Sequence, residues 1–537
     1  MEIRPTTVVK LFSGVPLNNN YTNTLYFSSL SAQSAYFGGL TPVKVFTSNY
    51  YQRVNKGQFE ARCKADDIYN CNYMAFQNSG FGDKWFYAFI TSVEYVNNNN
   101  ALVSFEIDVM QTWMFDYELK RCFIERQHEV HDQIGANIEP EPFHIDEYYF
   151  DDYRELEVGL RTQAIIAMIV ETPSGQTVGG GVYDNIYTGA TLYAYTNDST
   201  GWGLLNQKLV NYTQAPEAVV NLYMCPTYLL PPQSTNTGNP ITPGSSAKTA
   251  EITLPSVLED ESGGSARDFG TYTPKNNKLY TYPYCYLHID NGNASSLALR
   301  YEFFRGSIPP APHVTIDGSM ISPVQLTVRP SAYKGLPLGS SLYASPELTT
   351  ETLTISGFPL CSWNMDTYKA WLAQNSVPLE IQGAAAGAKL GMGIATGGVG
   401  FALVGKSVIS SIANVLTESY KASIAADICK GNVNSGNVNF SNGKMTFFVA
   451  RARVSMQKAE VIDSFFTMFG YAFNKVGLPN THSRPHWNYV KTNGCNVIGE
   501  CPADDIAKIC SIYDNGITFW KNASEVGNYT LDNSPST

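Results

Sequence analysis

The chain has 537 residues, which is enough for about two to four domains. Its formal net charge of −11 excludes the clustered basic surface that tight nucleic-acid binding needs. Charged residues make up only 15% and aromatic residues 13%, with many Tyr, Asn and Gly. Such a composition favours strands and turns over long helices, so we expect a mainly β protein.

The N-terminal third predicts strands. The opening residues MEIRPTTVVKLF carry charges at Glu2 and Arg4 and lack the apolar core of a signal peptide. Apolar and polar residues alternate over 85–93 and again over 101–110, and the turn-prone NNNN at 97–100 lies between them. We therefore predict a β-hairpin. One face of its second strand should be formed by Val103, Phe105, Ile107 and Val109.

The middle of the chain is less regular. Residues 130–290 are acidic and rich in Pro and Gly, with a linker-like stretch at 231–248. The apolar run AIIAMIV at 164–170 predicts a buried strand within an inserted domain that has long loops. The strand pattern resumes in YPYCYLHI, from Tyr282, and in LALRYEFF, from Leu297; DTYKAWLAQN then predicts a short helix capped by Asp366.

The C-terminal part predicts strands again. MTFFVARARV, from Met445, alternates and places Arg451 and Arg453 on its polar side. In SIYDNGITFW, the pair Asn515–Gly516 lies between two apolar runs, which predicts a hairpin with a two-residue turn.

An unusual apolar segment, GAAAGAKLGMGIATGGVGFALVG, begins at Gly383. Sixteen uncharged residues run from Leu390 to Gly405, and several glycines are spaced four apart, as in apolar helices that pack closely in lipid. A helical stripe follows, which Gly431 ends. A conventional transmembrane helix needs about 20 strongly apolar residues. The residues alone therefore leave open a Gly-rich loop packed in a core and a loop that enters membranes conditionally.

Candidate catalytic and metal-binding residues are weak. His128 and His131 are spaced three apart without a third ligand, which is typical of surface histidines, and His482 and His486 flank a turn-forming proline. The carboxylates of 146–157 fit a solvated acidic face better than a glycosidase pair. No nucleophile motif such as GxSxG occurs. We expect no enzyme, no cofactor and no metal.

The ten cysteines contain no CxxC pair. The nearest cluster, Cys495, Cys501 and Cys510, fits no common zinc spacing. Ordinary thiols and folding in a reducing cytoplasm are expected.

Several stretches carry a resemblance to a known family. GDKWFYAFITSVEY, VSFEIDVMQTWMFDYELKRCFIERQHE, TYPYCYLHI, HWNYVKTNG, IYDNGITFW and GNYT occur in this order. They resemble the distal tail knob protein of small short-tailed phages of the phi-29-like group. FEIDVMQTWMFD, at 105–116, is the most specific piece, and the resemblance is dense at both ends of the chain.

The resemblance implies a β-barrel-like tube of six copies at the virion tail tip, bound to other tail and collar proteins. An apolar loop of each copy would plug the lumen and later form a pore for DNA in the host cytoplasmic membrane. The protein would be made in the host cytoplasm, and the genome would pass without tight binding. A receptor-binding or cell-wall-degrading tail-tip protein is the alternative.

Two sets of residues follow from this resemblance. The predicted membrane-active loop comprises Gly383, Gly387, Leu390, Gly391, Met392, Gly393, Ile394, Gly397, Val399, Phe401, Leu403, Val404, Val408 and Ile412. The predicted segments are tube wall at 1–130, an inserted β-rich domain at 131–290, tube wall again at 291–375, the apolar loop and amphipathic helix at 376–432, and tube wall at 433–537.

Overall fold

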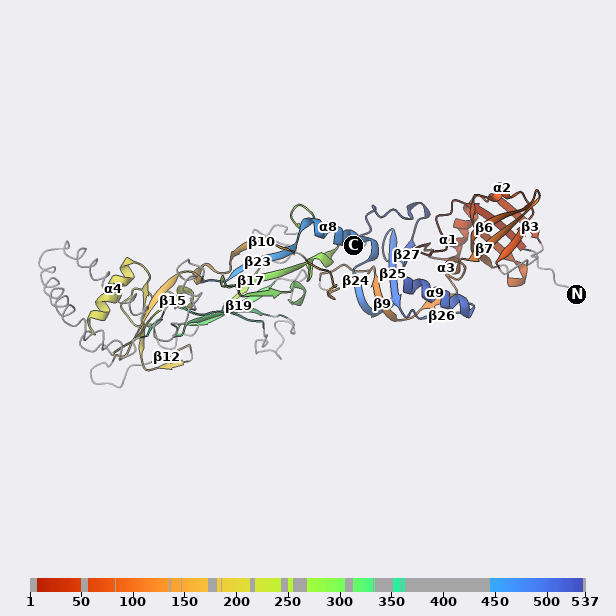
Figure 1. Ribbon diagram of the computed structural model, residues 1–537. Coiled ribbons are helices and arrows are strands. Elements are labelled where there is room, and N and C mark those ends of the chain that lie inside the picture. Colours follow the sequence, from red (N-terminus) through yellow and green to blue (C-terminus); the bar gives the residue numbers. More distant parts are fainter. Residues whose placement is uncertain are drawn as a thin grey trace, which may run out of the picture. The chain divides into compact units, whose positions relative to one another are not determined.

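The computed structural model describes residues 7–49, 57–82, 84–134, 137–145, 147–171, 181–184, 186–212, 218–242, 250–254, 268–304, 312–331, 333, 351–358, 360–362 and 445–534 (Figure 1). The fold is mainly β, as the composition predicts. Two compact units divide the chain: unit 1 is Met1–Glu147, Arg267–Tyr284 and Val454–Thr537, and unit 2 is Tyr148–Ala266 and Cys285–Arg453. The five predicted segments describe places in an assembled tube and stay a prediction.

The first sheet of unit 1 has six strands in the order β3-β1-β5-β6-β7-β4. The predicted hairpin is confirmed, because β6 and β7 pair antiparallel and Asn97 faces Asn100 across the turn. The second strand is shorter than predicted, since Asp108 caps a short helix that begins at Val109. The strands are β1 (Thr7–Ser13), β3 (Lys44–Asn49), β4 (Gln58–Ala61), β5 (Cys71–Asn78), β6 (Trp85–Asn97) and β7 (Asn100–Ile107), and the helices are α1 (Leu30–Gly39), α2 (Ala65–Ile68) and α3 (Val109–Thr112).

The second sheet of unit 1 joins the two ends of the chain. Its order is β2-β27-β25-β9-β24, and β2 runs parallel to β27, with Leu25 opposite Trp520. A two-stranded sheet pairs β26 with β8. The elements are β2 (Asn23–Leu25), β8 (Tyr117–Leu119), β9 (Cys122–Gln127), α8 (Met456–Phe469), β24 (Ala472–Gly477), β25 (Trp487–Asn493), β26 (Val497–Gly499), α9 (Ala503–Asn515) and β27 (Ile517–Trp520).

The predicted hairpin at Asn515–Gly516 is wrong. Helix α9 continues to Asn515, and Gly516 is its C-cap, whose N–H donates to the carbonyls of Ile512 and Tyr513. With φ +94°, Gly516 occupies a conformation that suits glycine both in a turn and at a helix end. The same dipeptide therefore fits both structures, and the buried face of α9 decides for the helix.

Within its described residues, unit 2 has three four-stranded sheets and one two-stranded sheet. The orders are β14-β11-β15-β22, β16-β19-β20-β21, β10-β23-β17-β18 and β12-β13. The described strands are β10 (Tyr148–Glu155), β11 (Gln163–Ile169), β12 (Gly181–Tyr183), β13 (Ile186–Thr188), β14 (Thr191–Thr196), β15 (Val219–Pro226), β16 (Ala250–Thr253), β17 (Cys285–Asp290), β18 (Ser296–Leu299), β19 (His313–Ser319), β20 (Gln325–Ser331), β21 (Leu353–Ile355), β22 (Leu360–Ser362) and β23 (Phe448–Val454), and the described α-helix is α4 (Ser199–Val210).

Three strand predictions in unit 2 are confirmed. The apolar run at 164–170 forms most of β11, which lies between β14 and β15 with most of its side chains buried. The run from Tyr282 forms β17, and the run from Met445 forms β23. Of the run from Leu297, only residues 297–299 belong to a strand, β18, because the chain turns into a short 3-10 helix at Tyr301. The 3-10 helices are η1 (Ser79–Phe81), η2 (Val158–Leu160), η4 (Thr227–Leu229), η5 (Asn277–Tyr280), η6 (Tyr301–Phe303) and η7 (Ala523–Glu525).

Candidate functional site

The predicted membrane-active loop and the predicted helix at Asp366 lie within 363–444, outside the described residues. The structure does describe what comes directly before and after this segment. Strand β22 ends at Ser362, and β23 begins at Phe448. Both strands belong to unit 2. The contacts of β22 and β23 therefore show how the chain is held on either side of the segment.

The first flank is a sheet edge. Strand β22 pairs antiparallel with β15, with Leu360 opposite Tyr223 and Ser362 opposite Asn221. Strand β15 pairs in turn with β11. Behind these strands lies a buried core formed by Ile165, Ala167, Ile169, Tyr193, Tyr195, Leu205, Val219, Leu222 and Met224. The backbone that leads into 363–444 is thus fastened to a packed sheet.

The second flank is held more deeply. Strand β23 lies between β10 and β17, and its residues from Val449 to Val454 are all buried. Just before it, the Phe447 carbonyl accepts a hydrogen bond from the Leu156 backbone at 2.8 Å, and the Thr446 hydroxyl donates to Glu155 at 3.0 Å. The backbone that leaves 363–444 therefore enters the middle of a sheet.

A partly buried ion cluster fixes β23 to β10. Asp151 Oδ2 accepts from Arg451 Nη2 at 2.7 Å and also from Arg453 Nε, and Asp151 Oδ1 accepts from Arg453 Nη2 at 3.0 Å. Burial raises the pKa of Asp151, but the hydrogen bonds from Arg453 and Arg451 outweigh burial and lower it. Arg451 and Arg453, predicted to lie on the polar side of β23, both bind Asp151, and both are buried rather than exposed to solvent.

The acidic cluster at 146–157 is solvated only in part. Asp152 is exposed, whereas Asp151 and Glu155 face partners within unit 2. Each of these two carboxylates hydrogen-bonds a side chain at 446–453 rather than the other carboxylate. The cluster therefore anchors β23, and the alternation of charges along β10 gave no sign of these distant partners.

His128 is not the surface residue that its spacing predicts. It is buried, its Nδ1 accepts from the Tyr489 backbone at 2.9 Å, and its Nε2 donates to the Thr467 carbonyl at 3.1 Å. Burial first, and then the charge of Arg484, lower its pKa to about 3. A neutral ring with both nitrogens in hydrogen bonds is structural, and His131 beside it in sequence is exposed.

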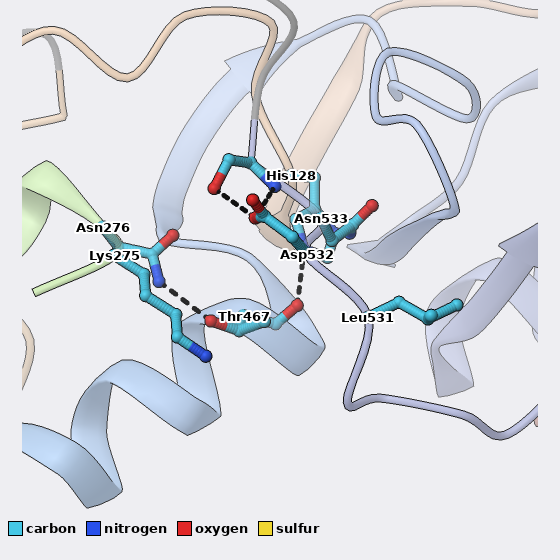
Figure 2. Close-up of a pocket in the computed structure, with 8 residues that line it drawn as sticks. His128, Lys275, Asn276, Thr467, Leu531, Asp532 and Asn533 are labelled. Carbon is cyan, nitrogen blue, oxygen red and sulfur yellow. Dashed lines mark hydrogen bonds between the residues drawn. The ribbon is translucent and has the colours of Figure 1, made fainter.

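Figure 2 shows the small pocket beside this histidine, within unit 1. Its polar groups are engaged with one another: Asn276 Nδ2 donates to Thr467 Oγ1 at 3.0 Å, and Asp532 accepts from Ser534. The pocket is lined by His128, Lys275, Asn276, Thr467, Leu531, Asp532, Asn533 and Ser534. The lining offers no arrangement of nucleophile and base.

His482 and His486, the second histidine pair, contact different partners. His486 Nδ1 lies 2.9 Å from Glu525 Oε2, and this hydrogen bond lowers the pKa of Glu525. His482 stacks instead on Tyr26, with ring centroids 5.0 Å apart. Within the described ranges, no cluster of three or more His, Cys, Asp or Glu side chains could hold a metal ion.

The cysteines whose side chains the structure describes are all free. Of the three cysteines that lie closest in sequence, Cys495 has Cys510 as a neighbour: burial and then Cys510 and Cys122 raise the pKa of Cys495. Cys501 instead has the carboxylates of Asp116 and Asp505 as neighbours. Across the part of the chain that the structure describes, no helix is both long and apolar enough to span a bilayer.

The motif FEIDVMQTWMFD lies at a buried junction of unit 1 that sequence reasoning did not locate. Asp108 caps α3 by accepting from the backbone N–H groups of Met110 and Gln111, each at 3.1 Å, and from the Tyr73 hydroxyl at 2.9 Å. The Gln111 side chain donates to the Leu25 carbonyl at 2.8 Å. Asp108 and Gln111 therefore tie α3 to other segments of unit 1.

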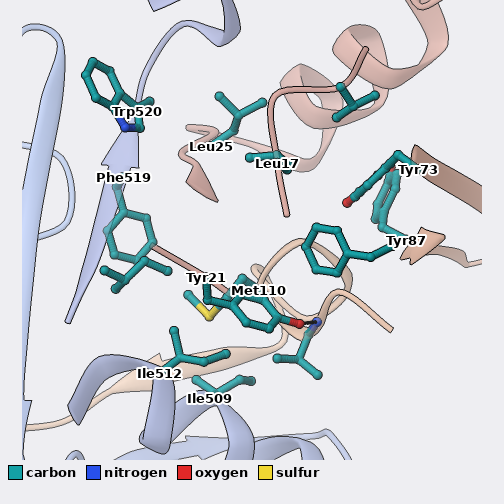
Figure 3. Packing of buried hydrophobic residues seen from close by; sticks show 14 of the residues in the cluster. Leu17, Tyr21, Leu25, Tyr73, Tyr87, Met110, Ile509, Ile512, Phe519 and Trp520 are labelled. Carbon is teal, nitrogen blue, oxygen red and sulfur yellow. Dashed lines mark hydrogen bonds between the residues drawn. The ribbon is translucent and has the colours of Figure 1, made fainter. Parts of the chain in front are cut away.

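Figure 3 shows the apolar core around this junction. Tyr21 belongs to this core, and its hydroxyl accepts from the Val109 backbone at 3.2 Å. Residues from both chain ends pack here: Phe12, Val15, Leu17, Tyr21, Leu25, Phe37, Tyr73, Ala75, Tyr87, Phe89, Val109, Met110, Trp487, Val490, Ile509, Ile512, Tyr513, Ile517, Phe519 and Trp520. A helix cap, a polar network and the apolar core therefore meet at this motif.

Comparison with known proteins gives matches to two family models. Residues 248–534 match the model of the C-terminal domain of tail knob protein gp9 of Bacillus phage phi29, and residues 5–118 match the N-terminus of caudoviral major tail proteins. Tail knob protein gp9 of Bacillus phage B103 is 27% identical and that of phi29 25% identical, each over 98% of both chains.

A solved structure shares the fold. The tail knob protein gp12 of bacteriophage C1 aligns with a TM-score of 0.61 and 16% identity, over 98% of this chain and 99% of that one. The gp9 family model spans more than half of the present sequence, and the relatives match it from end to end. The chain therefore belongs to the phage tail knob protein family that includes gp9 of Bacillus phage phi29.

Proposed function

We propose that six copies of this chain form a tube at the tail tip of a short-tailed phage and that the genome leaves through it. In this proposal the apolar segment at 376–432 first plugs the lumen and then forms a pore in the host cytoplasmic membrane. Family membership supports the tail knob role. The observation that carries the membrane role is an apolar, Gly-rich segment whose two flanks are both fastened in unit 2.

Fastened flanks suit a segment that changes its surroundings while the tube wall stays folded. The pairing of β22 with β15 holds one side, and the Asp151 cluster holds the other. Glycines four apart allow copies to pack closely in lipid. Lys389 and Lys406 interrupt the apolar run, and they would face lipid headgroups or a water-filled lumen.

The proposed lumen should let DNA slide. A conduit that gripped phosphates would slow ejection, so the lining should consist mainly of Asp, Glu, Asn, Ser and Thr, in keeping with the net charge of −11. Contacts with other tail and collar proteins would hold the tube on the virion. This role is structural and needs no catalytic residue or cofactor.

Deletion of residues 383–430 tests the membrane role. The deleted chain should still form rings, seen by electron microscopy and light scattering, because a plug contributes little to a wall. It should lose the ability to release dye from liposomes. Rings that keep full leakage would remove the membrane role, and a deletion that fails to fold would show that the segment is packed core.

A charge placed in the segment gives a finer test. Gly397→Asp or Ile394→Asp should cost about 2.5 to 3.5 kcal/mol per copy where the segment meets hydrocarbon. Leakage should fall while ring assembly persists. Asn99→Asp is the matched control, because it adds the same carboxylate at an exposed turn between β6 and β7. Equal leakage from all three variants would contradict insertion of the segment.

A further inference from the structure

Asn493 and Gly494 form an asparagine–glycine pair with both reactive groups accessible. Asn493 ends β25 and is exposed, and Gly494 is exposed with φ +73° and open space where a Cβ would lie. Among the described residues, neither the Asn493 side-chain amide nor the Gly494 N–H has a hydrogen-bond partner. This pair differs in these respects from the two other Asn–Gly pairs that the structure describes.

Asn291–Gly292 is protected on both sides. The Asn291 side chain is buried, its Oδ1 accepts from the backbones of Asn293 and Ser295, and its Nδ2 donates to the Thr354 carbonyl. The Gly292 N–H donates to Asp290 at 2.8 Å. A backbone nitrogen that is held in a hydrogen bond cannot lose its proton and turn toward the side chain of the preceding residue.

Asn515–Gly516 is protected at the nitrogen alone. Asn515 is exposed, but the Gly516 N–H donates to two carbonyls at the end of α9, those of Ile512 at 3.1 Å and Tyr513 at 3.2 Å. Attack on the side chain would require the helix end to open. One sequence motif therefore occurs in three chemical environments.

We propose that Asn493 is a site of spontaneous deamidation in the folded protein. The Gly494 nitrogen gives its proton to solvent hydroxide and attacks Cγ of Asn493. The new N–Cγ bond closes a five-membered succinimide, and the bond from Cγ to the side-chain nitrogen breaks, so that ammonia leaves. Water then opens either carbonyl of the ring and yields aspartate or isoaspartate. Glycine favours the closure because it has no Cβ to obstruct it.

The modification would act on the end of α9. One carboxylate oxygen, Asp514 Oδ1, accepts from Thr492 Oγ1 at 2.7 Å and from the Cys495 backbone at 3.0 Å. These two bonds fasten the chain on either side of the pair. Isoaspartate adds a methylene to the main chain between Thr492 and Cys495. The two hydrogen bonds to Asp514 therefore cannot both keep their geometry. The turn should detach from α9 in the isoaspartate form.

Incubation of the full-length protein at 37 °C and pH 8 tests the proposal. Peptide mass spectrometry, with fragmentation that separates aspartate from isoaspartate, follows residues 291, 493 and 515 over weeks. In the folded chain, deamidation at 493 should exceed that at 291 and 515 several-fold. In urea the three sites should react at similar rates. Asn493→Gln is the matched variant, since its longer side chain closes a ring far more slowly.

The outcomes are distinct. A folded chain that reacts equally at all three sites overturns the assignment, as does a chain that keeps the Asn493 amide when folded but loses it in urea. Thermal unfolding of the aged samples tests the consequence. The aged wild-type protein should unfold at a lower temperature than the aged Asn493→Gln protein. Equal losses in both proteins would overturn the proposed effect on α9.

Discussion

The buried cores of the two units are assembled in different ways. The junction core of unit 1 takes residues from 12–37, 73–110 and 487–520, so it needs both ends of the chain. The core behind β11 in unit 2 takes all its buried residues from 165–224. The first core can form only after most of the chain has been made, whereas the second uses neighbouring strands. The comparison predicts that damage spreads widely in unit 1 and stays local in unit 2.

Their polar groups differ as well. In unit 1 the buried carboxylate Asp108 binds backbone N–H groups and a tyrosine hydroxyl, and it has no ion pair with any residue that the structure describes. In unit 2 Asp151 binds two buried arginines. Burial disfavours the charged form of a carboxylate whose donors are all neutral. Two guanidinium groups, in contrast, favour the charged form of the carboxylate between them. The two carboxylates should therefore respond oppositely to pH.

The largest expected effect is that of Trp520→Ala. Trp520 is fully buried in the junction core, and its indole N–H donates to Asn23 at 2.8 Å. Removing the ring should destabilise unit 1 by about 3 to 5 kcal/mol. Hydrogen exchange should then speed up in β1, at the opposite end of the chain, because both share the core.

Leu205→Ala is the matched change in unit 2. It removes a buried side chain from the core behind β11 at a cost of about 2 to 5 kcal/mol. Faster exchange should appear in β11, β14 and β15 and not in β1. If Trp520→Ala leaves β1 protected, or Leu205→Ala exposes it, the contrast between the two cores fails.

Removal of the anchor on β23 should come next in size. Asp151→Asn leaves two buried arginines without their carboxylate, which should destabilise unit 2 by about 3 kcal/mol. Asp152→Asn is the control: Asp152 is exposed with φ +53°, a conformation that asparagine tolerates, so its effect should stay within about 0.5 kcal/mol. Urea unfolding measures both variants, and equal effects would show that the anchor stabilises nothing.

The pH dependence of Asp108 should be somewhat smaller. Burial raises its folded-state pKa from 3.8 to about 6, although the hydrogen bonds from Gln111, Tyr73 and Met110 lower it in part. The folded state is therefore penalised above pH 6, and the penalty fades as the pH falls below 6. Between pH 7 and pH 4.5 the wild type should gain about 2 kcal/mol relative to Asp108→Asn, which carries no titrating group.

Urea unfolding of the two proteins across this pH range measures the gain directly. The ion pair between Lys508 and Glu106 lies near this site, and it is present in both proteins, so its titration cancels in the difference. A difference that stays flat with pH would mean that Asp108 is not held in its buried, charged form at neutral pH.

Local patterns predicted the strands whose neighbours are close in sequence. The hairpin of β6 and β7 and the buried strand β11 were recognisable because alternation and apolar runs reflect which faces are covered. The same patterns could not show that Asp151 would meet Arg451 and Arg453, since these partners are separated by about 300 positions. Charged residues in an alternating strand look identical whether they face water or a distant counter-ion.

The junction motif also shows that sequence patterns do not reveal contacts between residues far apart in the chain. FEIDVMQTWMFD could be recognised as unusual and matched to a family, but its role depends on Tyr73, Leu25 and the core residues of β27 and α9. His128 was misplaced for a related reason, because its two hydrogen-bond partners lie on β25 and α8. The predicted loop residues lie outside the described part of the chain, and their role stays a prediction.

The smallest expected effects concern the helix end that the sequence suggested was a hairpin turn. At Gly516, φ is +94° and a Cβ would come within 2.3 Å of the Tyr489 hydroxyl. Gly516→Ala should therefore destabilise unit 1 by about 1 to 2 kcal/mol.

Asn515→Ala distinguishes the observed helix end from the predicted hairpin turn. As the last residue of α9, Asn515 should accept alanine within about 0.5 kcal/mol, because alanine is the better helix former. A type I′ hairpin would instead require positive φ at Asn515 and lose about 1 kcal/mol or more. Urea unfolding of the two variants decides between these outcomes, and a clear loss for Asn515→Ala would contradict the helix cap.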